Sequence, residues 1–77
     1  MKEVYVSLPT ADVVQRFVGT ITGLAGDFEL VSGARILDAR SLMGIFSFDL
    51  TKPILLRIYR DTQENLQALE PFLATGK

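Results

Sequence analysis

The stretch RSLMGIFSFDLTKPILLRIYR, from Arg40 to Arg60, carries the clearest structural signals in the chain. From Ile54 to Ile58 every second residue is aliphatic and lies on the same face, which is the period of a half-buried β-strand. Residues 51–53 (Thr-Lys-Pro) break the pattern ahead of this strand. The residues before the break are too crowded with apolar side chains to alternate, and Ser41 is suited to cap a short helix of about two turns. The stretch therefore predicts a short helix, a turn and a strand.

Downstream of that strand, the sequence predicts one last helix. Asp61 followed three residues later by Glu64 is typical of a capping box. Pro71 lacks a backbone donor, so it is expected to kink or end the helix early. The segment from Thr75 to Lys77 is expected to be a frayed tail. The inward stripe of the helix is formed by Leu66, Leu69, Phe72 and Leu73.

Upstream, the pattern predicts a strand, a helix and a hairpin. Lys2 to Leu8 alternates as a strand does. Thr10 is placed to cap the following amphipathic helix, and Asp12 falls in its first turn, where a negative charge suits the helix dipole. Two further runs, Asp27 to Ser32 and Ala34 to Asp38, flank a Ser-Gly turn signal and predict a hairpin.

The predicted order is strand, helix, strand, strand, helix, strand, helix. In 77 residues it favours a single α+β domain, residues 1–77, with an antiparallel or mixed sheet and the helices on one face, an open-faced sandwich. The other face of the sheet would meet water. That face is expected to include Tyr5, Val31, Leu37, Leu55 and Tyr59. They are either scattered surface apolar residues or a surface through which two copies form a homodimer.

Composition excludes several classes of function. The chain has no histidine and no cysteine, so it has no imidazole base, Ser-His-Asp triad, disulfide or zinc knuckle. Its net charge of -1 lacks the basic excess expected of a protein that binds nucleic acid. The longest apolar runs, about five residues, are far too short to span a membrane. We find no phosphate-binding glycine motif, metal-ligand spacing or catalytic carboxylate pair, so we expect no cofactor, no metal and no enzymatic activity, in a protein of the cytoplasm.

The segment ARSLMGIFSF, residues 39–48, followed by the strand LRIY, residues 56–59, resembles the second half of HPr. HPr is the histidine-containing phosphocarrier of the bacterial sugar phosphotransferase system. In that family a basic residue, a serine, an aliphatic residue, a methionine and a glycine open the second helix. The family also has the element order derived above. The resemblance implies a βαββαβα fold with a four-stranded antiparallel sheet and three helices on one face.

The phosphocarrier position of the family is altered in this chain. Alignment on Phe17 and Val18 places Thr10 where HPr has its phosphorylated histidine. Asp12 stands in place of the arginine that helps to hold the phosphate, and Val13 in place of the proline. Because the carboxylate of Asp12 would repel an incoming phosphate at the helix N-terminus, we expect no phosphocarrier activity.

The second functional position of the family matches this chain better. Ser41 aligns with the serine that HPr kinase/phosphorylase phosphorylates in HPr of Gram-positive bacteria, and Arg40 beside it would favour the phosphate. The apolar patch by which HPr docks onto enzyme I, the kinase and transcriptional regulators matches Leu42, Met43, Ile45 and Phe46. The resemblance thus implies a regulatory, protein-binding role like that of the catabolite-repression paralogue, which also lacks the histidine. In the alternative interpretation Ser41 is only a helix cap and its apolar neighbours only cover the core.

A rival from a different class is a small ferredoxin-like domain that binds a ligand or dimerises. It shares the order strand, helix, strand, strand, helix, strand. It would need a pocket outside the Ser41 segment, for example around Thr10 to Asp12. Sheet order separates the two folds: an HPr-like sheet has the fourth strand between the first and second, whereas a ferredoxin-like sheet runs fourth, first, third, second.

Overall fold

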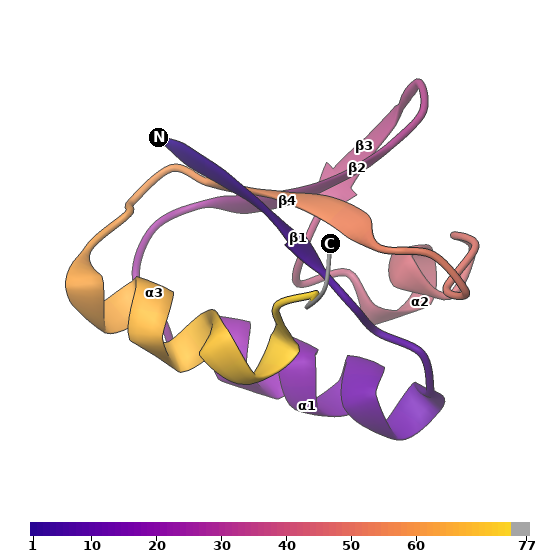
Figure 1. Cartoon of the computed structure of the whole chain (residues 1–77), viewed down its shortest axis with the longest axis horizontal. Coiled ribbons are helices and arrows are strands. Elements are labelled where there is room, and N and C mark those ends of the chain that lie inside the picture. Colours follow the sequence, from indigo (N-terminus) through magenta and orange to yellow (C-terminus); the bar gives the residue numbers. More distant parts are fainter. Residues whose placement is uncertain (75–77) are drawn as a thin grey trace.

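A computed structural model of the chain describes residues 1–74, which form one sheet and a layer of helices. The prediction for Thr75 to Lys77 lies outside the described residues. In chain order, the described elements are β1 (Lys2–Val6), α1 (Ala11–Thr22), β2 (Phe28–Ser32), β3 (Arg35–Asp38), α2 (Leu42–Ile45), β4 (Ile54–Ile58), α3 (Gln63–Leu69) and the 3₁₀-helix η1 (Glu70–Phe72) (Figure 1).

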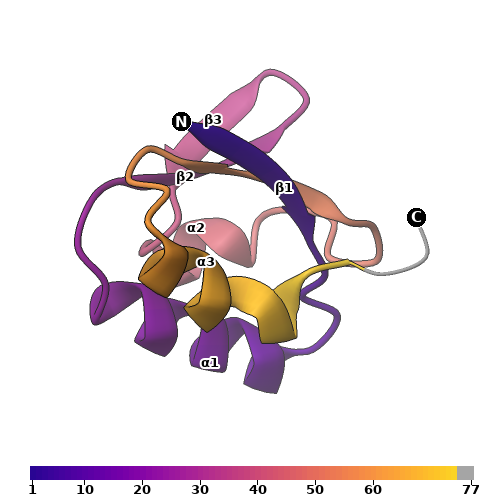
Figure 2. The ribbon, with the colours of Figure 1, turned by 60° about the vertical axis from the view of Figure 1, so that its left-hand side comes forward.

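The four strands lie in the order β1-β4-β2-β3, and all neighbours are antiparallel. The fourth strand therefore lies between the first and the second. This is the HPr-like order, so the predicted fold class is confirmed, and the sheet does not have the ferredoxin-like order. Helices α1, α2 and α3 all lie on the same side of the sheet, and the other side, which we call the open face, carries no helix (Figure 2).

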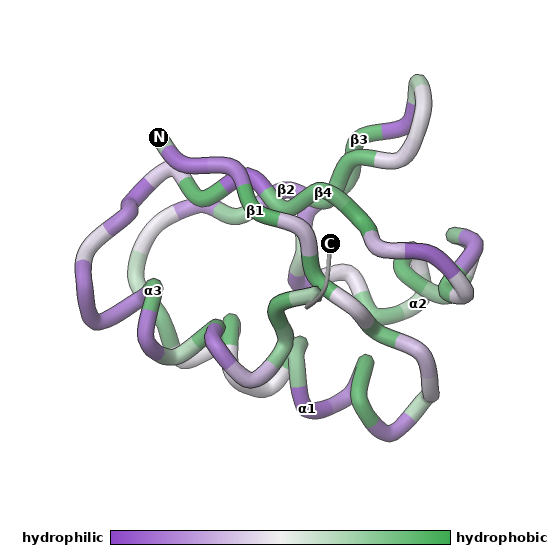
Figure 3. Tube along the Cα trace, viewed as in Figure 1, coloured by the Kyte–Doolittle hydropathy of each residue, from purple (hydrophilic) through white to green (hydrophobic). Residues whose placement is uncertain are grey.

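The core lies between the sheet and the helices. Along α1, hydrophobic and hydrophilic residues alternate with the turns of the helix, so one side packs inward (Figure 3). The rings of Phe17 in α1 and Phe72 in η1 meet edge to face, with centroids 5.4 Å apart. The buried apolar residues are Val6, Leu8, Val14, Phe17, Ile21, Phe28, Leu30, Ala39, Ile45, Phe48, Ile54, Leu56, Ile58, Leu69 and Phe72.

The N-termini of α1 and α3 are capped by threonine hydroxyls. Thr10 Oγ1 accepts a hydrogen bond from the backbone N–H of Val13 at 3.2 Å, as predicted. At α3 the cap is Thr62, which accepts from the N–H of Asn65 at 3.2 Å, so the predicted capping box beginning at Asp61 is wrong. The carboxylate of Asp61 lies instead 3.8 Å from the N-terminal ammonium of Met1. Pro71 falls inside η1, and α3 ends at Leu69, as the missing donor predicted.

The β2–β3 hairpin turns through two residues, because Ser32 pairs with Arg35. Gly33 is the first of the two and has φ of 60°, a conformation that glycine adopts without strain. In this register Leu30 pairs with Leu37, so Leu37 packs toward the core. The prediction that Leu37 lies on the open face is therefore wrong, and Ile36 lies there instead with 54% of its surface exposed.

Candidate functional site

The N-terminus of α1 holds the residues that align with the phosphocarrier position. Thr10 and Asp12 are both exposed, and the Thr10 hydroxyl is engaged as the helix cap. Asp12 Oδ2 pairs with Arg16 Nη2 at 3.0 Å one helical turn later, and about 70% of both side chains remains in water. The first turn of α1 therefore carries the carboxylate of Asp12, already paired with Arg16. A phosphate at the same place would meet this negative charge, so the arrangement does not favour phosphate binding.

A shallow depression of about 500 Å³ lies beside this helix start. Neither Thr10 nor Asp12 lines it. The only hydroxyl in its lining is that of Ser7, and no charged side chain contributes, so it offers little to orient a polar ligand. Its lining residues are Ser7, Pro9, Val13, Pro53, Pro71, Phe72, Leu73 and Ala74.

Helix α2 is one turn long rather than the two turns predicted. The hydroxyl of Ser47 donates to the carbonyl of Gly44 at 2.6 Å, and this bond helps to end the helix. Ser41 occupies the N-cap position, as expected, but its hydroxyl makes no capping hydrogen bond. Ser41 is also exposed, and its Oγ lies close to Gly44, where a Cβ would stand 2.9 Å from it.

The guanidinium of Arg40 is engaged by the loop between α1 and β2 and by the start of β2. Its Nη2 donates to the carbonyls of Leu24 and Gly26 at 3.0 and 2.9 Å. The guanidinium also lies over the ring of Phe28, 5.4 Å from its centroid. Arg40 therefore holds the loop between α1 and β2, and the described structure records no hydrogen bond from its guanidinium to the Ser41 hydroxyl.

The predicted docking patch on α2 is narrower in the structure. Met43 is 80% exposed and Phe46 40% exposed, whereas Leu42 is half-buried. Ile45 is completely buried in the core and has no surface to offer a partner. The expectation that Ile45 contributes to docking is corrected, because the single inward side of a one-turn helix is the side that Ile45 occupies. We call Met43, Phe46 and the exposed part of Leu42 the α2 surface.

Arg35 supports the α2 surface from the neighbouring strand, and the sequence did not single it out. Its Nη2 donates to Ser47 Oγ at 2.8 Å, and its guanidinium lies 5.1 Å from the centroid of the Phe48 ring. These contacts fix the segment that follows α2 against β3. Residues twelve positions apart are brought together here by the tertiary fold, so no local pattern marks them in advance.

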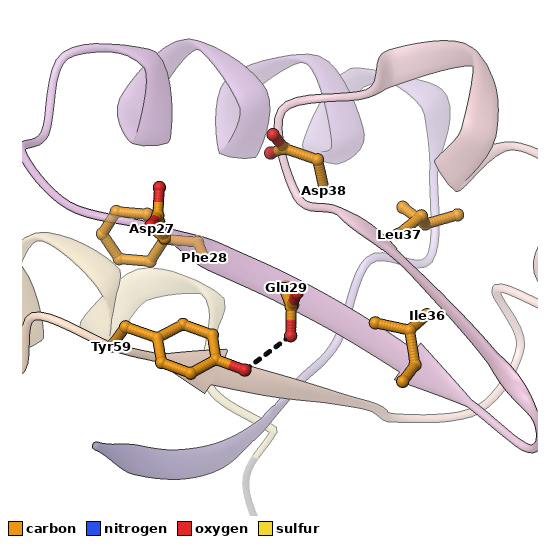
Figure 4. A pocket seen from close by; sticks show the side chains of 7 residues that line it. All are labelled: Asp27, Phe28, Glu29, Ile36, Leu37, Asp38 and Tyr59. Carbon is orange, nitrogen blue, oxygen red and sulfur yellow. Dashed lines mark hydrogen bonds between the residues drawn. The ribbon is translucent and has the colours of Figure 1, made fainter.

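A pocket of about 340 Å³ lies at the edge of the sheet, where β2, β3 and the end of β4 meet (Figure 4). The phenol of Tyr59 donates to Glu29 Oε1 at 2.7 Å across it. This hydrogen bond, with some desolvation, raises the pKa of Tyr59 above its usual value. The lining residues are Asp27, Phe28, Glu29, Ile36, Leu37, Asp38 and Tyr59.

Neither a metal centre nor a membrane span is found in the part of the chain that the structure describes. Within residues 1–74, no three acidic, histidine or cysteine side chains are grouped so that they could hold a metal ion. Across the same residues, no helix has both the length and the apolar character needed to cross a membrane.

Comparison with known proteins gives a structural match. No family model matches the chain, and no curated protein matches it by sequence. A crystal structure described as HPr-C-His from Thermoanaerobacter tengcongensis superposes with a TM-score of 0.73 and 25% sequence identity. The match covers 90% of this chain and 86% of that one, so it includes nearly every element described above. Sheet order and superposition agree: the chain has an HPr-like α+β fold.

Proposed function

We propose that this chain is an HPr-related protein of the bacterial phosphotransferase system that works by binding other proteins and not by carrying phosphate on histidine. The observation that carries this proposal is an HPr-like fold that combines an exposed α2 surface with an α1 N-terminus that carries Thr10 and Asp12 in place of the phosphocarrier residues. The elements that would present a docking patch are all present. The group that would relay phosphate is absent, since the chain contains no histidine.

The chemistry at α1 supports the loss of the relay step. A hydroxyl at Thr10 forms a phosphate ester, which lacks the transfer potential of a phosphorylated imidazole. The Asp12–Arg16 pair, 3.0 Å apart, also gives the helix start a carboxylate where a phosphate would need to approach. In this proposal the protein is not an enzyme and passes no phosphoryl group onward.

Regulation is assigned to Ser41. The residue is exposed and its hydroxyl is not used as a cap, so modification would break no hydrogen bond that the structure records for it. A phosphate there would place up to about two negative charges at the N-terminal end of the helix that carries Met43. Phosphorylation would therefore change which partners the α2 surface accepts.

The proposed partners are a kinase of the HPr type and a transcriptional regulator of carbon use, both met in the cytoplasm. An apolar side chain that is 80% exposed, as Met43 is, has its surface already available to such a partner. The flexible thioether of methionine adapts to more than one partner surface, which suits a protein with several partners.

Intact-mass measurement tests the regulatory serine. The protein is incubated with ATP and an HPr kinase/phosphorylase, alongside the Ser41→Ala and Ser47→Ala variants. One phosphoryl group is expected on the wild type and on Ser47→Ala, and none on Ser41→Ala. A wild type that stays unmodified would remove the regulatory-serine proposal, and labelling that survives Ser41→Ala would assign it to another residue.

Two further measurements test the lost relay and the α2 surface. Incubation with phosphoenolpyruvate and enzyme I is expected to leave the mass unchanged, and labelling there would overturn the lost-relay proposal. Met43→Glu is expected to lower kcat/KM for the kinase about tenfold or more, because it puts a charge into an apolar contact. Ile36→Glu, at an exposed apolar position on the open face, is the control and should leave kcat/KM unchanged.

A further inference from the structure

The open face of the sheet carries a continuous apolar row that crosses all four strands. Tyr5 in β1 pairs with Leu55 in β4, Leu55 with Val31 in β2, and Val31 with Ile36 in β3. Tyr5 is 58% exposed and Ile36 54%, and the two residues between them are half-buried. No helix or loop of the described chain covers this row (Figures 1 and 2). It is therefore an apolar surface that faces water on this side of the molecule.

The row two residues further along the strands is charged. Glu3 pairs with Arg57, Arg57 with Glu29, and Glu29 with Asp38. Arg57 Nε lies 3.1 Å from Glu3 and its Nη1 3.9 Å from Glu29. The cation is thus neutralised within its own sheet, and the row keeps an acidic balance. Whatever covers the apolar row must not place carboxylates over this charged row.

We propose that the open face pairs with the open face of a second copy of this chain, as a weak dimer whose two-fold axis runs along the apolar row. With this axis each residue of the row meets its own equivalent, so Tyr5 faces Tyr5 and Ile36 faces Ile36. The two charged rows then lie on opposite sides of the axis and do not face each other. A net charge of only -1 per chain adds little long-range repulsion.

The other simple two-fold arrangement is disfavoured by charge. An axis parallel to the strands, between β4 and β2, would place Glu3 of one copy over Asp38 of the other. Like charges brought face to face in an interface weaken association. Pairing through the β1 edge is also hindered, since part of that edge is already bonded: Ser7 donates to the carbonyl of Phe72, and Ala74 to that of Tyr5.

The size of the face sets the strength of the dimer. Strands roughly 4.8 Å apart, rising roughly 3.3 Å per residue, give a four-stranded face of about 20 by 16 Å. Two such faces together have an area of about 640 Å², below the roughly 1,000 Å² that a specific stable interface exceeds, so the contact belongs to the weak, transient class. We therefore expect dimers at protein concentrations on the order of 100 µM, with monomers prevailing well below that.

This proposal is independent of the proposed function, because the open face and the α2 surface lie on different sides of the sheet (Figure 2). Sedimentation equilibrium from about 10 µM to about 1 mM tests it. The wild-type mass is expected to rise toward twice 8.5 kDa. Ile36→Lys and Tyr5→Lys should stay monomeric, and Met43→Lys, an exposed apolar position on α2, should dimerise as the wild type does.

A wild type that stays monomeric throughout this range would overturn the proposal, as would dimerisation lost in Met43→Lys and kept in Ile36→Lys. The native chain has no cysteine, so a single introduced thiol reports the axis. Ile36→Cys at the sheet edge should be joined to a second copy by a short bismaleimide, and Met43→Cys should not. A dimer in which Ile36→Cys is not joined would rule out the proposed axis.

Discussion

The guanidinium of Arg40 lies over the ring of Phe28, 5.4 Å from its centroid, so the residue just before Ser41 in the sequence is anchored on β2. The same guanidinium donates to the carbonyls of Leu24 and Gly26. Arg40 thereby joins the end of α1, the start of β2 and the approach to α2. In this chain the basic residue before the serine has a structural role in the loops at one end of the sheet.

Arg40→Lys should therefore lower the free energy of unfolding. An ammonium cannot supply the same planar donor and stacking arrangement, so we expect a loss of about 1–2 kcal/mol, measured by urea unfolding. Arg16→Lys is the matched control, because Arg16 forms an exposed ion pair within one helix. It should change the stability by less than about 0.5 kcal/mol. Equal effects at the two positions would contradict the role assigned to Arg40.

Two glycine-to-alanine substitutions should have opposite effects. Gly26 has φ of 97°, and a Cβ there would stand 2.5 Å from the Cβ of Arg60, so Gly26→Ala should cost about 2 kcal/mol or more. Gly19 lies within α1, and a Cβ there would meet no atom within 4 Å. Gly19→Ala should therefore stabilise the protein by about 0.5–1 kcal/mol. Thermal unfolding monitored by circular dichroism measures the change in Tm, which should fall for Gly26→Ala and rise for Gly19→Ala. A stabilising Gly26→Ala would refute the strain argument.

Asn65 is the one buried polar residue of the described core, and its amide should be indispensable. Its Nδ2 donates to the carbonyls of Ala25 and Arg60, each at 2.9 Å. Asn65→Asp would set a carboxylate against two carbonyl oxygens, so we expect a loss of about 3 kcal/mol or more at neutral pH, measured by urea unfolding. Gln63→Glu, at the exposed start of the same helix, is the charge-matched control and should be neutral or mildly stabilising. Equal stability of the two variants would argue against the assigned role.

Gly44→Ala should displace the Ser41 hydroxyl but change the free energy of unfolding only slightly. A Cβ at position 44 would stand 2.9 Å from Ser41 Oγ and 3.2 Å from Leu37 Cδ2. The serine can rotate away, so unfolding should change by less than about 1 kcal/mol. The displaced hydroxyl should be phosphorylated more slowly by the kinase of the proposed function, in a rate measured by intact mass. An unchanged rate would show that the hydroxyl position does not matter to the kinase.

The Tyr59 phenol should titrate at a higher pH than usual. Its hydrogen bond to Glu29, with desolvation, raises its pKa above the ordinary value of about 10. Absorbance in a Tyr5→Phe background isolates this ring, since the chain has two tyrosines, and Glu29→Gln should lower the pKa. Because the folded-state pKa is the higher one, this contribution to stability is complete below pH about 10 and is lost as the pH rises through the folded-state pKa. A pKa that Glu29→Gln leaves unchanged would refute this cause.

The elements that depend on local patterns were predictable. Alternation identifies β4, and helical periodicity with a threonine cap identifies α1. In each case the residues that form the signal are only a few positions apart in the sequence. Capping at α3 was assigned to Asp61 because two adjacent residues, Asp61 and Thr62, can both cap a helix. Which one does so depends on where the chain leaves the sheet.

Features set by tertiary contacts were not predictable. Leu37 was placed on the wrong face because a two-residue turn fixes the β3 register, and a shift of one residue reverses every side chain. Ile45 was assigned to a docking surface because a one-turn helix shows no period from which its buried side can be read. The engaged guanidiniums of Arg35 and Arg40 depend on partners twelve or more residues away.

The position of β4 has a consequence for how the chain assembles. Its partners are β1 and β2, and Lys2 at one end of the chain pairs with Ile58. Residues 1–53 contain three strands, yet only β2 and β3 can pair among them, so β1 stays unpaired until β4 inserts as the central strand. Such long-range closure slows folding relative to local contacts. A chain cut in the turn before Pro53 would yield one fragment with β1, β2 and β3 and another with only β4, and the two would reconstitute the sheet only together.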